Sequence, residues 1–283
     1  MTGFASPSSL DEAIRMLAGQ PDLRPMAGCT DLMVSDPLQR LSLVGVLDLL
    51  RVPELKGIRE SEDCVEIGAT TTFSEIGSSN LISERFPALA AAARVVGGWQ
   101  IQNRATIGGN VVNASPAGDS LPVLLALDVQ VIVAGAEGER EVPFSSFYLG
   151  YRETALRRGE LLVRLRIPFV PAGTRQYFRK VGTREAQAIS KVVVSVVGRV
   201  EEGAIADFRV GAGSVAATPV RLHQVEEAVV GGPANPETAD RAERTVVESV
   251  EPIDDVRSTA AYRRFALGRI VRRMTLDLIA DAV

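Results

Sequence analysis

Two glycine-containing segments carry the residue types that can bind an anion. Residues 27–32 read AGCTDL and follow a predicted strand, and residues 106–110 read TIGGN and lead through a polar stretch to Asp119. Glycine and small polar residues let consecutive backbone N–H groups converge on an anion, because no bulky side chain blocks the approach. Each segment alone is equally well explained as an ordinary strand–helix turn, but together they predict a clamp for a pyrophosphate.

Neither segment matches a common nucleotide-binding motif. The dinucleotide fingerprint GxGxxG and the P-loop GxxxxGK[ST] are both absent from them, which disfavours a generic nucleotide-binding module. Any phosphate site built from these residues must therefore belong to another class of fold.

The small number of histidines and cysteines excludes other chemistry. The 283 residues include one histidine, His223, and two cysteines, Cys29 and Cys64. An iron–sulfur cluster normally needs four thiolates, and a structural zinc ion needs four Cys or His ligands. A histidine-dependent hydrolase would rely on His223, which lies near the start of a predicted helix and is interpreted as a surface or capping residue. We therefore predict no metal ligand and no catalytic side chain.

Charge and hydropathy narrow the function further. The net charge of −4 has the wrong sign for a nucleic-acid-binding surface. No apolar run approaches the length that crosses a bilayer, and the N-terminal residues lack the basic and apolar regions of a signal peptide. With few cysteines and no export signal, we expect a reducing, cytoplasmic location.

The N-terminal part is predicted to mix helices and strands around the glycine segments. Ser9 and Glu12 form a capping box that begins a helix. We expect strands over residues 23–27, 44–49, 64–69, 129–135 and 161–168, helices over 83–96 and 120–127, and a long ordered loop over 104–119. The strand over 161–168 alternates apolar with basic residues and ends at a proline, which is typical of an edge strand.

A different pattern follows residues 168–174 (PFVPAGT), the best candidate for a linker. Three strands within QYFRKV, AISKVVVSVVGRV and AIADFRVGAGSV predict an antiparallel meander, and helices are expected over about 221–230, 236–249 and 258–281. The last helix is predicted to have an apolar side and a solvated basic side. The apolar side holds Tyr262, Phe265, Ile270, Met274 and Leu278, and the basic side holds Arg263, Arg264, Arg269, Arg272 and Arg273.

Four motifs, in this order, resemble the FAD-binding medium subunits of molybdenum hydroxylases. They are AGCTDL, RATIGGNVVNASPAGDSLPVLLALD, FRKVGTREAQAISKVVVSV and VRSTAAYRRFAL. The family includes flavin subunits of xanthine dehydrogenases, carbon monoxide dehydrogenases and hydroxybenzoyl-CoA reductases, and the resemblance runs nearly end to end. The second and third motifs look closer to the xanthine dehydrogenase branch than to the carbon monoxide branch.

The resemblance implies an α+β fold of the vanillyl-alcohol-oxidase type. A two-part FAD-binding domain, over residues 1–57 and 58–171, is followed by a smaller C-terminal domain over residues 172–283. The C-terminal domain is expected to hold a three-stranded antiparallel sheet and helices. The break that the residue patterns predict near residue 170 agrees with this division.

The resemblance also implies how FAD is bound. In the family, the two glycine segments hold the diphosphate, an acidic residue bonds the hydroxyl-bearing portion, and a strand and a lysine lie beside the flavin ring. The corresponding residues here are Ala27, Gly28, Cys29, Thr30, Asp31, Leu32, Thr106, Ile107, Gly108, Gly109, Asn110, Asp119, Leu162 and Lys180. A cation at Lys180 would stabilise the anionic reduced flavin, whereas a solvated strand lysine is the alternative.

One residue departs from the family's pattern. The usual first segment reads Ala-Gly-Gly-Thr-Asp, and Cys29 replaces its second glycine. Cysteine carries a Cβ atom, so a left-handed backbone at this position would cost free energy. Either the backbone here is not left-handed or the loop is altered. Cys64 lies in a predicted strand and is interpreted as a core residue.

The resemblance implies an electron-transfer subunit of a xanthine dehydrogenase-like complex. Substrate is oxidised at a molybdopterin centre in a large subunit, and electrons pass through 2Fe–2S clusters in a small subunit to FAD in this chain. The flavin delivers them to NAD, a quinone or dioxygen, and the complex is expected to be a dimer of heterotrimers. Two alternatives stay open: a self-contained FAD-dependent oxidoreductase, and an assembly subunit that has lost FAD.

Overall fold

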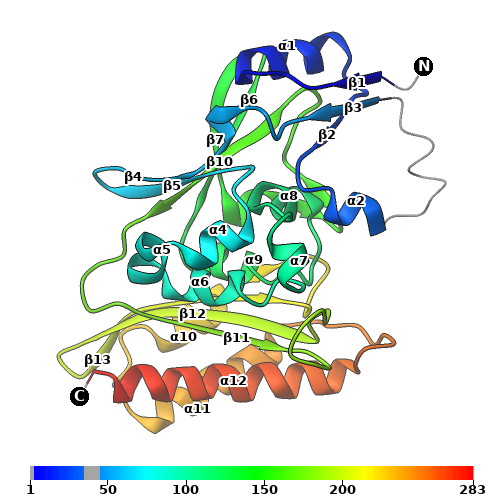
Figure 1. The fold of residues 1–283 in the computed structure, drawn as a ribbon. Coiled ribbons are helices and arrows are strands. Elements are labelled where there is room, and N and C mark those ends of the chain that lie inside the picture. Colours follow the sequence, from blue (N-terminus) through cyan, green and yellow to red (C-terminus); the bar gives the residue numbers. More distant parts are fainter. Residues whose placement is uncertain (1–2, 35–44, 283) are drawn as a thin grey trace.

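The chain begins with a small parallel sheet covered by one helix. The computed structural model describes residues 3–34 and 45–282. Strands β1 (Gly3–Ala5), β3 (Gly45–Asp48) and β2 (Arg24–Met26) lie side by side in that order. Helix α1 (Leu10–Gly19) lies near the N-terminus (Figure 1), and Ser9 caps it with a side chain that accepts from the Glu12 N–H. The predicted capping box forms only in part, because the Glu12 carboxylate accepts from the Ser8 N–H and not from that of Ser9.

A five-stranded antiparallel sheet forms the centre of the N-terminal part. Its order is β4 (Ile58–Glu60), β5 (Cys64–Gly68), β10 (Leu161–Pro168), β6 (Gln130–Gly135) and β7 (Gly138–Pro143). The prediction of an edge strand over 161–168 was wrong, because β10 lies between β5 and β6. Its alternating arginines mark a wet face of the sheet instead: Arg164 and Arg166 pair with Glu66 on one side and with glutamates of β7 on the other.

Short helices lie between this sheet and the C-terminal part (Figure 1). They are α4 (Phe73–Ser78), α5 (Asn80–Arg85), α6 (Pro87–Ala93), α7 (Trp99–Gln102), α8 (Ile107–Asn113) and α9 (Leu121–Ala126). The single helix predicted over 83–96 is wrong, because Pro87 cannot donate to the preceding turn and starts a new helix. The loop predicted over 104–119 is also partly helical. Its glycines and asparagines disfavour a helix locally, but tertiary packing overrides that preference in α8.

The N-terminal part also contains several shorter elements. They are α2 (Thr30–Val34), the 3₁₀ turns η1 (Pro53–Leu55) and η2 (Phe144–Ser146), and the two-stranded sheet of β8 (Tyr148–Gly150) and β9 (Glu153–Thr154).

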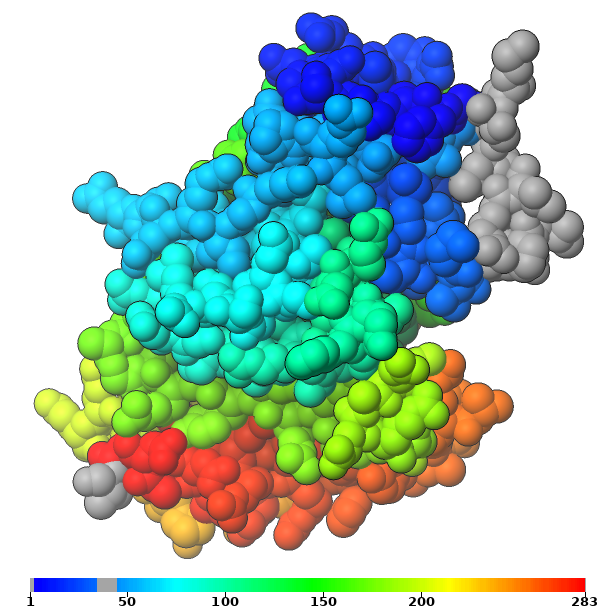
Figure 2. Space-filling model, in the orientation of Figure 1, coloured from blue at the N-terminus to red at the C-terminus, as the bar shows by residue number. Residues whose placement is uncertain are grey.

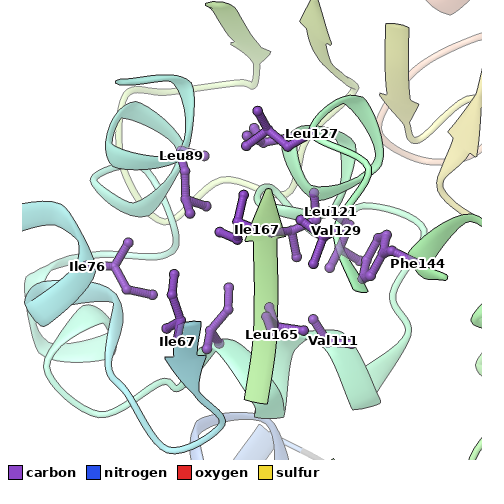
Figure 3. Close-up of a cluster of buried hydrophobic side chains, with 14 of the residues drawn as sticks. Ile67, Ile76, Leu89, Val111, Leu121, Leu127, Val129, Phe144, Leu165 and Ile167 are labelled. Carbon is purple, nitrogen blue, oxygen red and sulfur yellow. The ribbon is translucent and has the colours of Figure 1, made fainter. Parts of the chain in front are cut away.

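A hydrophobic core joins the helices to the five-stranded sheet. Figure 3 shows Leu165 and Ile167 of β10 among Ile67 of β5, Leu89 of α6 and Val111 of α8. All of these side chains are fully buried. The core therefore fixes where α8, which carries the second glycine segment, lies against the sheet.

The C-terminal part is a four-stranded antiparallel sheet backed by helices. The strands are β11 (Arg175–Val181), β12 (Val192–Glu201), β13 (Ala204–Gly213) and β14 (Val220–Arg221), and the helices are α10 (His223–Val229), α11 (Pro236–Glu248) and α12 (Ala260–Ala280). The prediction of three strands missed β14. A strand of two residues is too short to show an alternating pattern, so only its pairing with Gly211 and Ala212 of β13 identifies it.

The side of helix α12 that packs against the core differs from the side that its sequence predicts. Leu267, Val271, Met274 and Leu278 are buried, as is Arg263, which was assigned to the solvated side. Tyr262 and Phe265, predicted to be on the apolar side, are 42% and 63% exposed. Within the described ranges, no helix, α12 included, is long and apolar enough to cross a membrane.

The two parts meet along a tightly packed seam, which Figure 2 shows from one side. A Cβ atom at Gly211 of β13 would lie 2.0 Å from the carbonyl oxygen of Pro122 in α9, so only glycine permits this contact. Arg221 of β14 crosses the seam to the Leu125 carbonyl and to Asp128. The domain boundaries after residues 57 and 171 stay predictions.

Candidate functional site

The first glycine segment makes a sharp turn from β2 into α2. Cys29 has φ 62°, in the left-handed region, and its thiol donates to the Ala27 carbonyl at 3.4 Å. Among the described residues, the backbone N–H groups of Gly28, Cys29 and Thr30 have no protein acceptor. Three consecutive unpaired N–H groups form the kind of donor set that receives a phosphate oxygen.

The fold brings the two glycine segments together. A Cβ atom at Gly28 would lie 1.8 Å from the carbonyl oxygen of Arg104, two residues before Thr106. Glycine is therefore required here for a close approach of two backbones, not for a positive φ. The contact places the first segment directly against the start of the second, as a two-sided clamp requires.

The second segment differs from the expectation that its N–H groups are free. Thr106 caps α8 with its hydroxyl, which accepts from the Gly109 N–H at 3.1 Å. The N–H groups of Ile107, Gly108 and Asn110 donate to Thr71, Ala69 and Thr106 carbonyls, at 2.9–3.0 Å. These four N–H groups hold α8 in place, so a contribution of this segment to a ligand depends on its side chains. A Cβ atom at Gly109 would lie 2.9 Å from the Thr106 hydroxyl oxygen, so glycine permits this close capping contact.

A buried polar cluster lies next to the second segment. The Lys180 Nζ atom is 2.6 Å from Asp119 Oδ2 and also donates to the Val95 carbonyl at 2.8 Å. The Ser190 hydroxyl donates to the other carboxylate oxygen, Oδ1, at 2.6 Å. The segment before α9 is tied to α8 as well, because Ser120 donates to the Asn110 side chain. Asp119 and Lys180, 61 residues apart, thus meet in one cluster.

Burial controls the charges in this cluster. The side chains of Lys180 and Asp119 are 8% and 9% exposed. Burial raises the pKa of the Asp119 carboxyl, and the charge of Lys180 and the hydrogen bonds from Lys180 and Ser190 act in the opposite direction. The ammonium of Lys180 and the carboxyl of Asp119 therefore face each other as a buried ion pair.

The other candidate residues lie in less distinctive surroundings. Leu162 is 5% exposed and belongs to the hydrophobic core, beside an irregularity in the pairing of β10 with β6. Cys64 is buried, as predicted. His223 is exposed at the start of α10, in agreement with its interpretation as a surface residue.

One residue of the cluster, Ser190, and one buried residue behind it, Arg263, were missed from the sequence. Ser190 lies in the FRKVGTREAQAISKV motif but was given no role, and Arg263 was assigned to a solvated face. No local pattern distinguishes them, since serine and arginine both occur mostly at surfaces. The signal that was available is their position inside two of the four motifs.

Comparison with known proteins identifies the family of the chain. Residues 1–170 match the family described as the FAD binding domain in molybdopterin dehydrogenase, and residues 176–278 match the CO dehydrogenase flavoprotein C-terminal domain. The chain is 31% identical to the glyceraldehyde dehydrogenase medium chain of Sulfolobus acidocaldarius, over 98% of this chain and 97% of that one. It is 30% identical to the xanthine dehydrogenase FAD-binding subunit of Escherichia coli, over 100% of this chain and 97% of that one.

A solved structure shows the same fold. The carbon monoxide dehydrogenase of Hydrogenophaga pseudoflava contains a chain that superposes with a TM-score of 0.90 at 30% identity, over 96% of this chain and 95% of that chain. The match covers both the FAD-binding part and the C-terminal part. The chain therefore belongs to the family of FAD-binding medium subunits of molybdenum hydroxylases, an oxidoreductase family, and its cofactor is FAD.

Proposed function

We propose that this chain takes electrons from 2Fe–2S clusters in a small partner subunit and passes them through FAD to a soluble or membrane-borne acceptor. The observation that carries the proposal is the match of both family domains, in order, over residues 1–170 and 176–278. A flavin supplies the required chemistry, since it accepts single electrons and releases pairs. A molybdopterin-binding large subunit would complete the complex, as a dimer of heterotrimers.

The residues of the first segment fit the diphosphate of FAD. The N–H groups of Gly28, Cys29 and Thr30 are consecutive and unpaired within the described chain, and neutral donors of this kind bind phosphate without a P-loop lysine. Ala27, Asp31 and Leu32 complete this turn in the proposal. Thr106, Ile107, Gly108, Gly109 and Asn110 would form the opposite wall.

The buried cluster fits the remainder of the cofactor. Asp119 would accept from a hydroxyl of the cofactor, and Lys180 would lie beside the flavin ring with Leu162 on the neighbouring strand. Because Asp119 compensates the charge of Lys180, the pair would act on the flavin as a dipole and not as an isolated cation. The expected effect of Lys180 on the flavin potential is therefore smaller than the sequence alone suggests.

The isolated chain provides the first test. Expressed alone, it should be yellow, should bind one FAD per chain, and should contain neither iron nor molybdenum. FAD-indifferent, colourless protein would contradict the proposal and favour the assembly-subunit alternative. Substrate turnover by the isolated chain would favour the self-contained oxidoreductase.

Native purification provides the second test. We expect chains that carry molybdenum and 2Fe–2S clusters to co-purify with this one, and reduction of its flavin by substrate only in their presence. Mixing the reduced complex with NAD, a quinone or dioxygen in turn identifies the acceptor by the rate of flavin reoxidation. The substrate of the co-purified large subunit decides whether the complex is xanthine dehydrogenase-like, since the relatives at 30–31% identity are named for different substrates.

A further inference from the structure

Both oxygens of the Asp119 carboxylate are held by the protein. Oδ2 accepts from Lys180 and Oδ1 accepts from the Ser190 hydroxyl, each at 2.6 Å. Ser190 is 1% exposed and Asp119 is 8% exposed. A carboxylate with a donor on each oxygen cannot rotate without breaking a charge-assisted hydrogen bond. Ser190 therefore determines how Asp119 faces Lys180.

Ser190 is itself held by a closed ring of hydrogen bonds. Its carbonyl accepts from the Ser214 hydroxyl at 2.8 Å, and the Ser214 N–H donates to the Pro116 carbonyl at 2.7 Å. Pro116 lies three residues before Asp119, so the ring returns to the segment it started from. Ser214 has φ 65°, a left-handed conformation that costs free energy and that persists where surrounding contacts fix it.

Arg263 of α12 closes this arrangement from the far side. Its guanidinium donates to the Ser214 carbonyl at 2.8 Å and to the Lys191 carbonyl at 3.3 Å. A third hydrogen bond, at 2.7 Å, goes to Asp255. The side chain is only 5% exposed, and burying a cation costs free energy unless it is paired and hydrogen-bonded. The guanidinium therefore bridges the two loops that carry Ser190 and Ser214.

We propose that Ser190 is a positioning residue of the FAD site, which fixes the Asp119–Lys180 pair for the cofactor, and that Arg263 holds Ser190 in place. This inference rests on the proposed binding of FAD at Asp119 and Lys180. Arg263 belongs to the VRSTAAYRRFAL motif, so this inference gives that motif a function, which the proposed binding of FAD alone does not. Ser190 and Arg263 act through Asp119 and do not themselves need to touch the cofactor.

The test compares two buried serines, Ser190 in the loop before β12 and Ser195 within β12. Ser190→Ala removes the hydrogen bond to Asp119. Ser195→Ala removes a buried hydroxyl that donates to the Tyr177 carbonyl at 2.9 Å and to no other acceptor in the described part of the chain. FAD is removed from the full chain and titrated back by flavin fluorescence. We expect Ser190→Ala to weaken FAD binding about 10-fold, the size of a lost hydrogen bond to a charged group, and Ser195→Ala to leave it unchanged.

Two further variants distinguish a positioning role of Ser190 from a general loss of structure. Ser190→Thr keeps the hydroxyl and should restore most of the affinity. In the background of Asp119→Asn, Ser190→Ala should have little further effect, because both changes act on one interaction. The absorption spectrum of the bound flavin should also change in Ser190→Ala and stay as in the wild type in Ser195→Ala.

A variant of Arg263 tests the second step. Arg263→Lys keeps the charge but cannot reach two carbonyls and Asp255 at once, so it should weaken FAD binding and should not add to Ser190→Ala. Arg273→Lys, at a side chain that is 76% exposed, is the matched control.

The outcomes separate this inference from the function on which it rests. Wild-type protein that ignores FAD would overturn the proposed function. Wild-type protein that binds FAD and is weakened by Asp119→Asn, but that responds equally to Ser190→Ala and Ser195→Ala, would overturn the positioning role alone. FAD binding unaffected by Asp119→Asn would also overturn it, because the pair would then lie outside the site.

Discussion

Lys180 of β11 and Asp119 of the segment before α9 form a buried ion pair across the seam between the N-terminal and C-terminal parts. Their charged atoms are 2.6 Å apart, and their side chains are 8% and 9% exposed. The pair joins the region matched by the FAD-binding family to the region matched by the flavoprotein C-terminal family. The pair therefore contributes to the contact between the two parts, and the proposed FAD site uses the same two residues.

Breaking this pair from one side should strongly destabilise the protein. Lys180→Met leaves a buried carboxylate without its counter-charge and should lower the free energy of unfolding by about 3–5 kcal/mol. The double variant Lys180→Met/Asp119→Leu should recover much of that loss, because no charge is then buried.

Urea unfolding measures the stability of the single and the double variant. The control is Arg158→Met, whose pair with Asp22 is 68% and 67% exposed and should contribute less than about 1 kcal/mol; equal losses at both pairs would contradict the prediction.

A methyl group at Gly28 should separate the two glycine segments. Gly28→Ala places a Cβ atom 1.8 Å from the Arg104 carbonyl oxygen, so one backbone must move. We expect a loss of about 1–3 kcal/mol in stability and more than about 10-fold weaker FAD binding, measured by urea unfolding and by FAD titration. Gly19→Ala, where a Cβ atom meets nothing within 4 Å, should change neither. Wild-type FAD affinity in Gly28→Ala would show that the contact is not needed for the site.

Restoring glycine at position 29 should stabilise the chain. Cys29 has φ 62°, which costs a residue with a Cβ atom about 1–2 kcal/mol and costs glycine almost nothing. Glycine also raises the conformational entropy of the unfolded chain, which offsets part of this gain. We therefore expect Cys29→Gly to raise the free energy of unfolding by about 0.5–1 kcal/mol. Thermal and urea unfolding check this. Cys29→Ala removes the thiol but keeps the Cβ atom, so a gain of the same size in that variant would refute the backbone explanation.

Asp255 should stabilise the fold in a pH-dependent way. Although burial opposes it, hydrogen bonds from the Arg257 and Ser258 N–H groups and from Arg263 lower the pKa of Asp255 to about 2. The unfolded chain takes up this proton first as pH falls, so the stabilisation is complete above about pH 4 and is lost as pH falls through the folded pKa. Asp255→Asn should cost about 1 kcal/mol at neutral pH, after allowance for solvent screening, and almost nothing near pH 2. Urea midpoints at several pH values test this, and a difference that does not vary with pH would rule it out.

Much of the secondary structure could be predicted from the sequence. The strand over 161–168, the helix after Ser120 and the three C-terminal helices lie close to where the patterns place them. The errors arise where a local signal has two meanings. Alternating arginines marked β10 as an edge strand, but the same alternation results when a central strand has one charged face. The partners of these arginines lie on the adjacent strand β5 and on β7, which is beyond β6. Glycine and asparagine marked 104–119 as a loop, but contacts with residues 69–72 fold part of it into α8.

The candidate site was less predictable than the family to which it belongs. Cys29 could be recognised from the sequence as an unusual residue, yet two backbone conformations were equally consistent with it until φ was known. Lys180 and Asp119 were both identified, but as separate contacts of the cofactor and not as partners of each other. The prediction that Arg263 is solvated was wrong, because the pattern of charges along α12 does not show which side of the helix packs against the loops at Lys191 and Ser214.

By itself, the sequence determined the family, the cofactor and the two glycine segments, because each depends on short motifs whose residue types are read along the chain. Only the tertiary structure decided that Gly28 meets Arg104, that Lys180 pairs with Asp119, and that Arg263 is buried. These are contacts between segments far apart in sequence, and a residue's type carries no record of its partner. Burial and pairing set the electrostatic role of each charge, so that role emerges only when the chain is folded.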